Sequence, residues 1–124
     1  GAASVVADAA EWAGANFDLV IDYAGFETTT QAATKALKRG GRVVLVGLGR
    51  SEIILDSLAL VRSEVEILGS GGGTWQDVAD VYSLLASGEV SPQWSSISFS
   101  EIPQGLDDLR HHRITGRVVA RITE

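Results

Sequence analysis

The sequence predicts an α/β fold built on a parallel β-sheet, and three runs of apolar residues carry this prediction. Residues 17–22 and 42–46 are nearly continuous aliphatic runs, which are typical of interior strands covered on both faces. An alanine-rich segment with helical spacing lies between them, and a strand–helix–strand unit of about thirty residues forces its two strands to be parallel. Residues 64–68 alternate polar and apolar side chains, which predicts an edge or interface strand with one exposed face.

Capping and turn residues predict the ends of the elements in the first half of the chain. Residues 4–7 form a short apolar run consistent with a strand, and a helical turn over 9–13 follows, ended by a glycine. A helix should begin at the hydroxyl cluster 28–30, because hydroxyl oxygens accept from free backbone N–H groups. It should run through Leu37 and stop at the glycine pair 40–41.

A capping box marks a helix in the second half of the chain. Thr74 and Asp77 have the spacing of this motif, and apolar residues recur behind them at helical spacing up to Gly88. A shorter helical turn is expected over 57–61.

A last helix is expected near Ser100, where Pro103 fits the first turn. This helix should bury Leu106 and Leu109 and lead into a final strand over 117–122.

Length, charge and composition exclude several classes of function. The 124 residues are enough for one domain or part of one, and no apolar run approaches the roughly 20 residues of a membrane helix. Sixteen acidic against ten scattered basic residues argue against nucleic-acid binding. Without cysteine there is no thiolate chemistry, so we expect a cytoplasmic location. A chain that lacks Met and starts at Gly1 is expected to be a piece of a longer protein.

The glycine-rich segment 69–73 lies between a strand and a helix, where a phosphate loop could sit. A dinucleotide fingerprint would need glycine at Thr74, and the Lys-Ser/Thr pair of a P-loop is missing. A flexible turn is a simpler explanation than a phosphate cradle. We favour a third use, in which small residues let a planar ligand lie against the backbone.

Few side chains qualify for catalysis or metal binding. His111 and His112 are adjacent, so on a helix they point about 100° apart and predict a solvated helix end rather than a zinc site. Ser70 has no histidine or acid near it in the sequence. Asp18 and Asp22 flank a strand, where carboxylates can act as acids and bases but more often cap a helix or face solvent.

Two glycine-bearing loops follow consecutive parallel strands. Residues 23–26 follow the strand 17–22, and residues 47–49 follow the strand 42–46. Ligands of open parallel sheets bind beyond the carboxyl ends of the strands. These loops therefore mark the expected ligand side.

Four segments, in order, resemble the C-terminal half of medium-chain dehydrogenases, the zinc-type alcohol dehydrogenases and their relatives. The segments are residues 17–25, 40–47, 67–70 and 116–119. The resemblance implies a partial Rossmann-type parallel sheet, about its third to sixth strands, plus the C-terminal helix–strand segment of the catalytic domain. Residues 1–70 would then belong to the NAD(P)-binding domain, and 71–124 would return to the catalytic domain. The family's glycine fingerprint and zinc ligands would lie upstream of Gly1.

The resemblance also implies a binding surface for NAD or NADP. The loop after the first strand would line the ribose and pyrophosphate, backbone from the next two loops would hold the nicotinamide and its ribose, and a guanidinium would approach the pyrophosphate. The implied cofactor-binding residues are Ala24, Gly25, Phe26, Thr29, Val46, Gly47, Leu48, Ser70, Gly71, Gly72 and Arg117. No catalytic residue or metal ligand is implied in this chain, although the parent could hold zinc.

The implied function is that of a fragment of an NAD(P)-dependent oxidoreductase, which transfers hydride between an alcohol or carbonyl substrate and nicotinamide. The chain alone is not expected to be catalytically competent. The strand 64–68 resembles the one that pairs with its twin in dimeric relatives, so a homodimer is expected. Two alternatives stay open: a zinc-free quinone or enoyl reductase fragment, and a non-catalytic dimerisation or interaction module.

Overall fold

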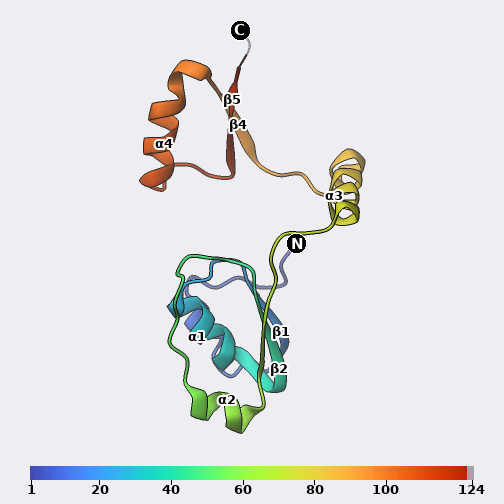
Figure 1. Ribbon diagram of the computed structural model, residues 1–124, viewed down its shortest axis with the longest axis vertical. Coiled ribbons are helices and arrows are strands. Elements are labelled where there is room, and N and C mark those ends of the chain that lie inside the picture. The colour runs from blue at the N-terminus through green and yellow to red at the C-terminus, as the bar shows by residue number, and fades with distance from the viewer. Residues whose placement is uncertain (123–124) are drawn as a thin grey trace. The chain divides into compact units, whose positions relative to one another are not determined.

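Parallel strands connected by helices form both sheets in the described residues, which confirms the predicted α/β class (Figure 1). The computed structural model describes residues 1–122. It contains two compact units, Gly1–Gly72 and Gly73–Glu124, each with its own sheet. None of the helices in the described part of the chain combines the length and the apolar character needed to cross a membrane.

The first unit is a three-stranded parallel sheet in the order β1-β2-β3, with helix α1 beside it (Figure 1). Its elements, in chain order, are the 3₁₀ helix η1 (Ala9–Trp12), β1 (Phe17–Asp22), α1 (Glu27–Ala36), β2 (Leu37–Leu45), α2 (Ser57–Ser63) and β3 (Glu66–Gly69). The predicted strand–helix–strand unit is therefore confirmed as β1-α1-β2. The predicted helical turns at η1 and α2 are also present.

The core of this unit lies between α1 and the central strand. Val43 on β2 is fully buried against Ala33 of α1 and Leu37. The short alanine side chains of α1 let the helix backbone approach the sheet closely, and half-buried Phe17 and Val65 close the edges of the cluster. This packing fixes the ends of β1 and β2 relative to each other.

The predicted end of the first helix is wrong. Helix α1 stops at Ala36, and Leu37 already pairs with Phe17 as part of β2. Regular pairing resumes only at Arg42, opposite Leu19, so residues 38–41 bulge out of the ladder. Because Leu37 is 8% exposed as a strand residue, burial outweighs the glycine stop signal. Gly40, at a φ of 70°, shapes the bulge instead.

Two further expectations for this unit are wrong. Residues 4–7 form no strand, because they have no strand to pair with and stay largely exposed. Strand β1 is not interior within this chain, since β2 is its one sheet neighbour among residues 1–122. Leu19 and Ile21 are consequently 50% and 45% exposed. Strand β3 lies at the other edge, as its alternating pattern predicts.

The second unit contains a second parallel strand pair joined by a helix (Figure 1). Its elements are α3 (Trp75–Ser87), β4 (Trp94–Ser98), the 3₁₀ helix η2 (Phe99–Glu101), α4 (Ile102–Arg110) and β5 (Arg117–Arg121). The capping box of α3 is confirmed, because the Thr74 backbone N–H donates to the Asp77 carboxylate at 2.6 Å. Gly88 ends that helix in the left-handed conformation. Strand β4 was not predicted from the sequence.

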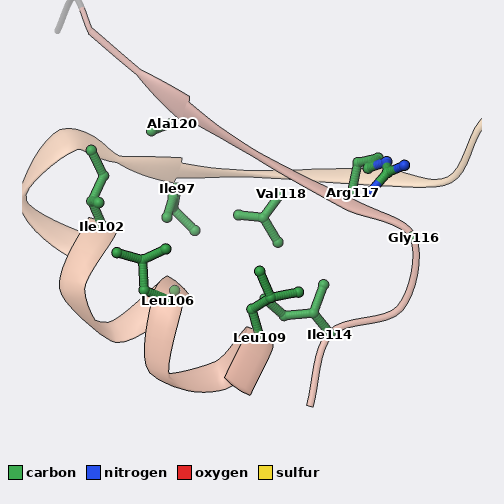
Figure 2. Close-up of a pocket in the computed structure, with 10 residues that line it drawn as sticks. Ile97, Ile102, Leu106, Leu109, Ile114, Gly116, Arg117, Val118 and Ala120 are labelled. Atoms are coloured by element: carbon green, nitrogen blue, oxygen red, sulfur yellow. The ribbon is translucent and has the colours of Figure 1, made fainter. Parts of the chain in front are cut away.

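The expected burial of Leu106 and Leu109 is wrong. These side chains of α4 point toward the strands, with Ile97 and Val118 on the facing side, around an apolar cavity of about 310 Å³ (Figure 2). The cavity is open, and the two leucines are 58% and 59% exposed. A single helix over two strands is too small to enclose them.

Candidate functional site

Three loops meet at the carboxyl edge of the first sheet. The last paired residues of the strands lie side by side, Asp22 opposite Leu45 and Leu45 opposite Gly69. The next amides continue this contact, because Gly47 N donates to Asp22 O at 3.0 Å and Ser70 N donates to Leu45 O at 2.9 Å. The structure thus brings together the predicted site segments after β1, β2 and β3.

The first two loops are packed backbone against backbone. A Cβ atom on Gly25, whose φ is 66°, would lie 2.0 Å from the carbonyl oxygen of Gly47. A Cβ atom on Gly47 would lie 2.3 Å from the carbonyl oxygen of Tyr23. Further along, Arg50 N donates to Gly25 O at 2.9 Å. Gly25 and Gly47 are therefore needed because the backbones of the two loops are in contact. They do not serve to leave room for a ligand.

The third loop borders open space. A Cβ atom on Gly69, Gly71 or Gly72 would meet no atom within 4 Å. A flat ring could therefore approach the backbone of this loop without meeting a side chain. The contact of this loop with nicotinamide stays a prediction.

The Asp22 side chain holds the loop after β1 through several hydrogen bonds. Asp22 is 5% exposed, and its carboxylate accepts hydrogen bonds from Ala24 N at 3.0 Å, Gly25 N at 2.9 Å and the Thr30 hydroxyl at 2.8 Å. Burial raises the pKa of Asp22, but the hydrogen bonds from Gly25, Thr30, Thr29 and Ala24 outweigh it and bring the pKa below its usual 3.8. Asp22 is therefore a charged structural group, whereas Asp18 pairs with Lys38 on the exposed surface.

Three residues predicted to line the cofactor, Thr29, Phe26 and Leu48, differ in how far their side chains are available to a ligand. The Thr29 hydroxyl accepts from Phe26 N at 3.1 Å and lies 3.0 Å from a carboxylate oxygen of Asp22, so protein groups already occupy it. The Phe26 ring is 48% exposed beside Gly49. On the second loop, Leu48 is 92% exposed.

Arg117 lies in the other unit, at the start of β5. Gly116, at a φ of 80°, lets the chain enter the strand tightly against Gln93, and Arg117 N then donates to Gln93 O at 2.9 Å. Arg117 is one of the residues that line the apolar cavity in Figure 2, and within residues 1–122 its guanidinium forms no ion pair. Its contact with a cofactor stays a prediction.

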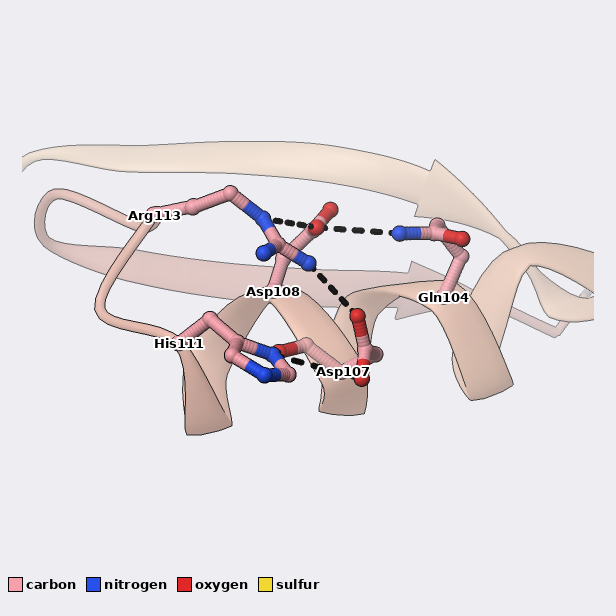
Figure 3. A network of polar contacts seen from close by, with 5 residues as sticks. All are labelled: Gln104, Asp107, Asp108, His111 and Arg113. Atoms are coloured by element: carbon pink, nitrogen blue, oxygen red, sulfur yellow. Dashed lines mark hydrogen bonds and ion pairs between the residues drawn. The ribbon is translucent and has the colours of Figure 1, made fainter.

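A network of polar contacts connects the C-terminal end of α4 to the residues that follow it (Figure 3). Arg113 donates to Asp108 at 2.8 Å and to Asp107 at 2.5 Å, and His111 Nδ1 lies 2.8 Å from the Asp107 carbonyl oxygen. Hydrogen bonds from Arg113 and Gln104 lower the pKa of Asp108. The sequence does not predict this network, because Arg113 lies beyond the helix, where helical spacing gives no signal.

The comparisons with known proteins identify the family. Residues 1–87 match the model of the family described as zinc-binding dehydrogenase. The chain belongs to this family. The resemblance to medium-chain dehydrogenases is thereby confirmed. Residues 1–122 contain no group of three or more His, Cys, Asp or Glu side chains that could hold a metal ion.

Similarity to individual proteins supports this assignment to the zinc-binding dehydrogenase family. The chain is 29% identical, over 106 residues, to D-arabinose 1-dehydrogenase (NADP(+)) of Saccharolobus solfataricus, covering 86% of this chain and 30% of that protein. The structure of acetophenone reductase from Geotrichum candidum in complex with NAD is similar with a TM-score of 0.79 at 33% identity, over 85% of this chain and 31% of that one. An alcohol dehydrogenase from Aeropyrum pernix gives a TM-score of 0.75 at 25% identity, over 85% and 30%. The chain thus spans less than a third of the length of these relatives.

Proposed function

We propose that the chain is part of an NAD(P)-dependent oxidoreductase that transfers hydride between an alcohol or carbonyl substrate and nicotinamide. The observation that carries the proposal is the meeting of three loops at one sheet edge, with open space beside the third. Family membership supports it, as do relatives whose names include NADP and whose structures hold NAD.

Each loop has a proposed part in holding the cofactor. Residues 24–26 and Thr29 would border the ribose and pyrophosphate, and Arg117 would approach the pyrophosphate with its paired donors. The backbone of 46–48 and 70–72 would orient the nicotinamide and exclude water from one of its faces. The bound cofactor would supply the hydride chemistry, and this chain would supply orientation. Because the described residues offer no zinc site, the proposal covers zinc-dependent and zinc-free members alike.

The carboxyl-edge loops are proposed to bind the cofactor weakly on their own. The helix N-terminus that follows a glycine fingerprint is the strongest pyrophosphate anchor of this fold class, and the sequence contains no such fingerprint. The test is an NMR titration of the labelled chain with NADH and with NADPH at millimolar concentration. We expect shift changes at the amides of Gly47, Ser70 and Gly71, with those of Ser83 on α3 as the control. Changes spread evenly over the chain, or none at the loops, would contradict the proposal.

A homodimer through the free edge of β3 is also proposed. Strand β3 pairs with β2 on one side, and its other edge has no strand partner among residues 1–122. The resemblance to dimeric medium-chain dehydrogenases predicts that this strand pairs with its counterpart in a second copy. Val65, however, packs against the core cluster, so the contact surface would consist of β3 itself, Glu66–Gly69.

A further inference from the structure

We infer that Asp22 is the positioning residue of the candidate cofactor surface, because it holds the loops after β1 and β2 in one arrangement. The inference rests on the proposed function. It assigns to Asp22 no contact with the cofactor or the substrate, since its side chain is buried.

The carboxylate of Asp22 acts on the first loop. One oxygen, Oδ1, accepts from both Ala24 N and Gly25 N, which fixes the turn that immediately follows β1. The other oxygen, Oδ2, accepts from the Thr30 hydroxyl at 2.8 Å, and Thr30 is fully buried on α1. The turn is thus held to the sheet and to the helix by one charged group, and hydrogen bonds to charged groups are roughly twice as strong as neutral ones.

The backbone carbonyl of Asp22 acts on the second loop. Val46 N and Gly47 N both donate to it, each at 3.0 Å. The two loops then lie so close that neither Gly25 nor Gly47 can carry a side chain. Any shift of the first loop is therefore transmitted by direct contact to the backbone proposed to hold the nicotinamide.

The pattern of bonds separates this role from ordinary helix capping. A capping side chain accepts from the backbone amides of the first helical turn. Asp22 accepts instead from amides that precede α1, and it meets the helix only through the hydroxyls of Thr29 and Thr30. The charge of Asp22 therefore organises the loop rather than the helix end.

The test compares Asp22→Ala with Asp18→Ala, which removes a carboxylate from the other end of the same strand. The first readout is native-state hydrogen exchange of individual amides in the full chain. We expect Asp22→Ala to speed the exchange of Ala24 and Gly25 by about tenfold or more relative to Asp18→Ala, since each loses a hydrogen bond to a charged acceptor. Exchange at Val43, in the buried core, serves to correct for global stability.

A conservative variant keeps the test decisive if Asp22→Ala does not fold. Asp22→Asn retains an oxygen acceptor for the two loop amides but loses the charge, so exchange at Ala24 and Gly25 should rise by a smaller factor, about threefold. Unchanged exchange at these amides in either folded variant would overturn the inference.

The second readout separates this inference from the proposed function. NADPH is titrated into the wild type, Asp18→Ala and the folded Asp22 variant, with the amide shifts of Gly47 and Ser70 followed by NMR. We expect wild-type shifts in Asp18→Ala and reduced shifts in the Asp22 variant. Equal shifts in all three would overturn the positioning role while leaving the proposed function intact. An absence of shifts in the wild type would overturn the proposed function, and the exchange rates would still show whether Asp22 orders the loops.

Discussion

At the scale of single residues, the glycines at the sheet edge serve two different purposes. Gly25 and Gly47 allow two backbones to touch, whereas Gly71 faces space that no protein atom fills. The sequence shows the same small residue at all three positions, so composition alone does not separate these purposes. Substitutions that add a side chain distinguish these purposes. A side chain at Gly25 or Gly47 should reduce the stability of the fold, whereas a side chain at Gly71 should reduce ligand binding.

Adding a side chain at Gly71 should block the cofactor without harming the fold. A Cβ atom there meets nothing within 4 Å, so Gly71→Ala and Gly71→Leu should unfold at the wild-type urea concentration. The leucine should weaken NADPH binding about 10- to 100-fold, since overfilling a packed contact costs about 1–3 kcal/mol, so the shift changes at millimolar NADPH should be lost. The NMR titration described above measures this effect, with Gly71→Ala as the size control. Wild-type affinity in Gly71→Leu would place the cofactor elsewhere.

Adding a methyl group at Gly47 should instead destabilise the protein. The new Cβ atom would lie 2.3 Å from the Tyr23 carbonyl oxygen, and backbone on both sides would have to move. We expect Gly47→Ala to lower the free energy of unfolding by about 1–3 kcal/mol in urea titrations. Gly71→Ala is the matched control, and equal stability of the two variants would show that the loops separate easily.

The lowered pKa of Asp22 predicts a loss of stability in acid. The folded chain holds this carboxyl ionised at pH values where the unfolded chain protonates it, so the unfolded state binds more protons and stability rises with pH. The contribution is present above the unfolded value of about 3.9 and disappears as the pH falls through the lower folded value. Lowering the pH from about 6 to about 3 should therefore reduce the free energy of unfolding of the wild type more than that of Asp22→Asn. Urea titrations at each pH measure this difference. Parallel curves for the two proteins would refute this assignment.

At the scale of elements, the sequence patterns located strands and helices well where burial and capping agree. Strand β1 and the start of α3 are where the patterns place them, because an aliphatic run and a capping box each act locally. The end of α1 was misplaced because Leu37 gains more from packing on Val43 than the following glycines indicate. Strand β4 was not predicted because Ile97 is its one half-buried residue. Its three serines leave no alternation of polar and apolar side chains that would indicate a strand.

The candidate site was predictable in its location but not in its internal bonding. Loops after consecutive parallel strands must share one edge, so the ligand side follows from topology alone. The bonds of Asp22 to Thr30 and to Gly25 depend on where α1 begins and how its first turn rotates toward the sheet. Periodicity gives those positions only to within a few residues, which is why capping and catalysis both stayed open for this carboxylate.

At the scale of the whole molecule, much apolar surface remains uncovered. Leu19 and Ile21 of β1 are about half exposed, and so are Leu106 and Leu109 of α4. Soluble monomers rarely leave contiguous apolar surface of this kind open. These side chains therefore mark candidate surfaces for contact with another protein, such as a second copy of the chain.

The free edge of β3 predicts that the chain associates with itself. An exposed strand edge offers unpaired backbone groups to a second copy, and two copies of one edge form a two-fold contact in which each covers the other. Leu68 on this strand is 45% exposed, and a lysine on an edge strand opposes such pairing. We expect the wild type to elute as a dimer in size exclusion with light scattering at micromolar concentration, and Leu68→Lys to shift it toward the 13.1 kDa monomer. Asp80→Lys adds the same side chain to α3, which is not part of this sheet, and should leave the dimer intact. A folded wild-type monomer would exclude pairing through β3, whereas a dimer that survives Leu68→Lys would move the contact to another of the exposed apolar surfaces.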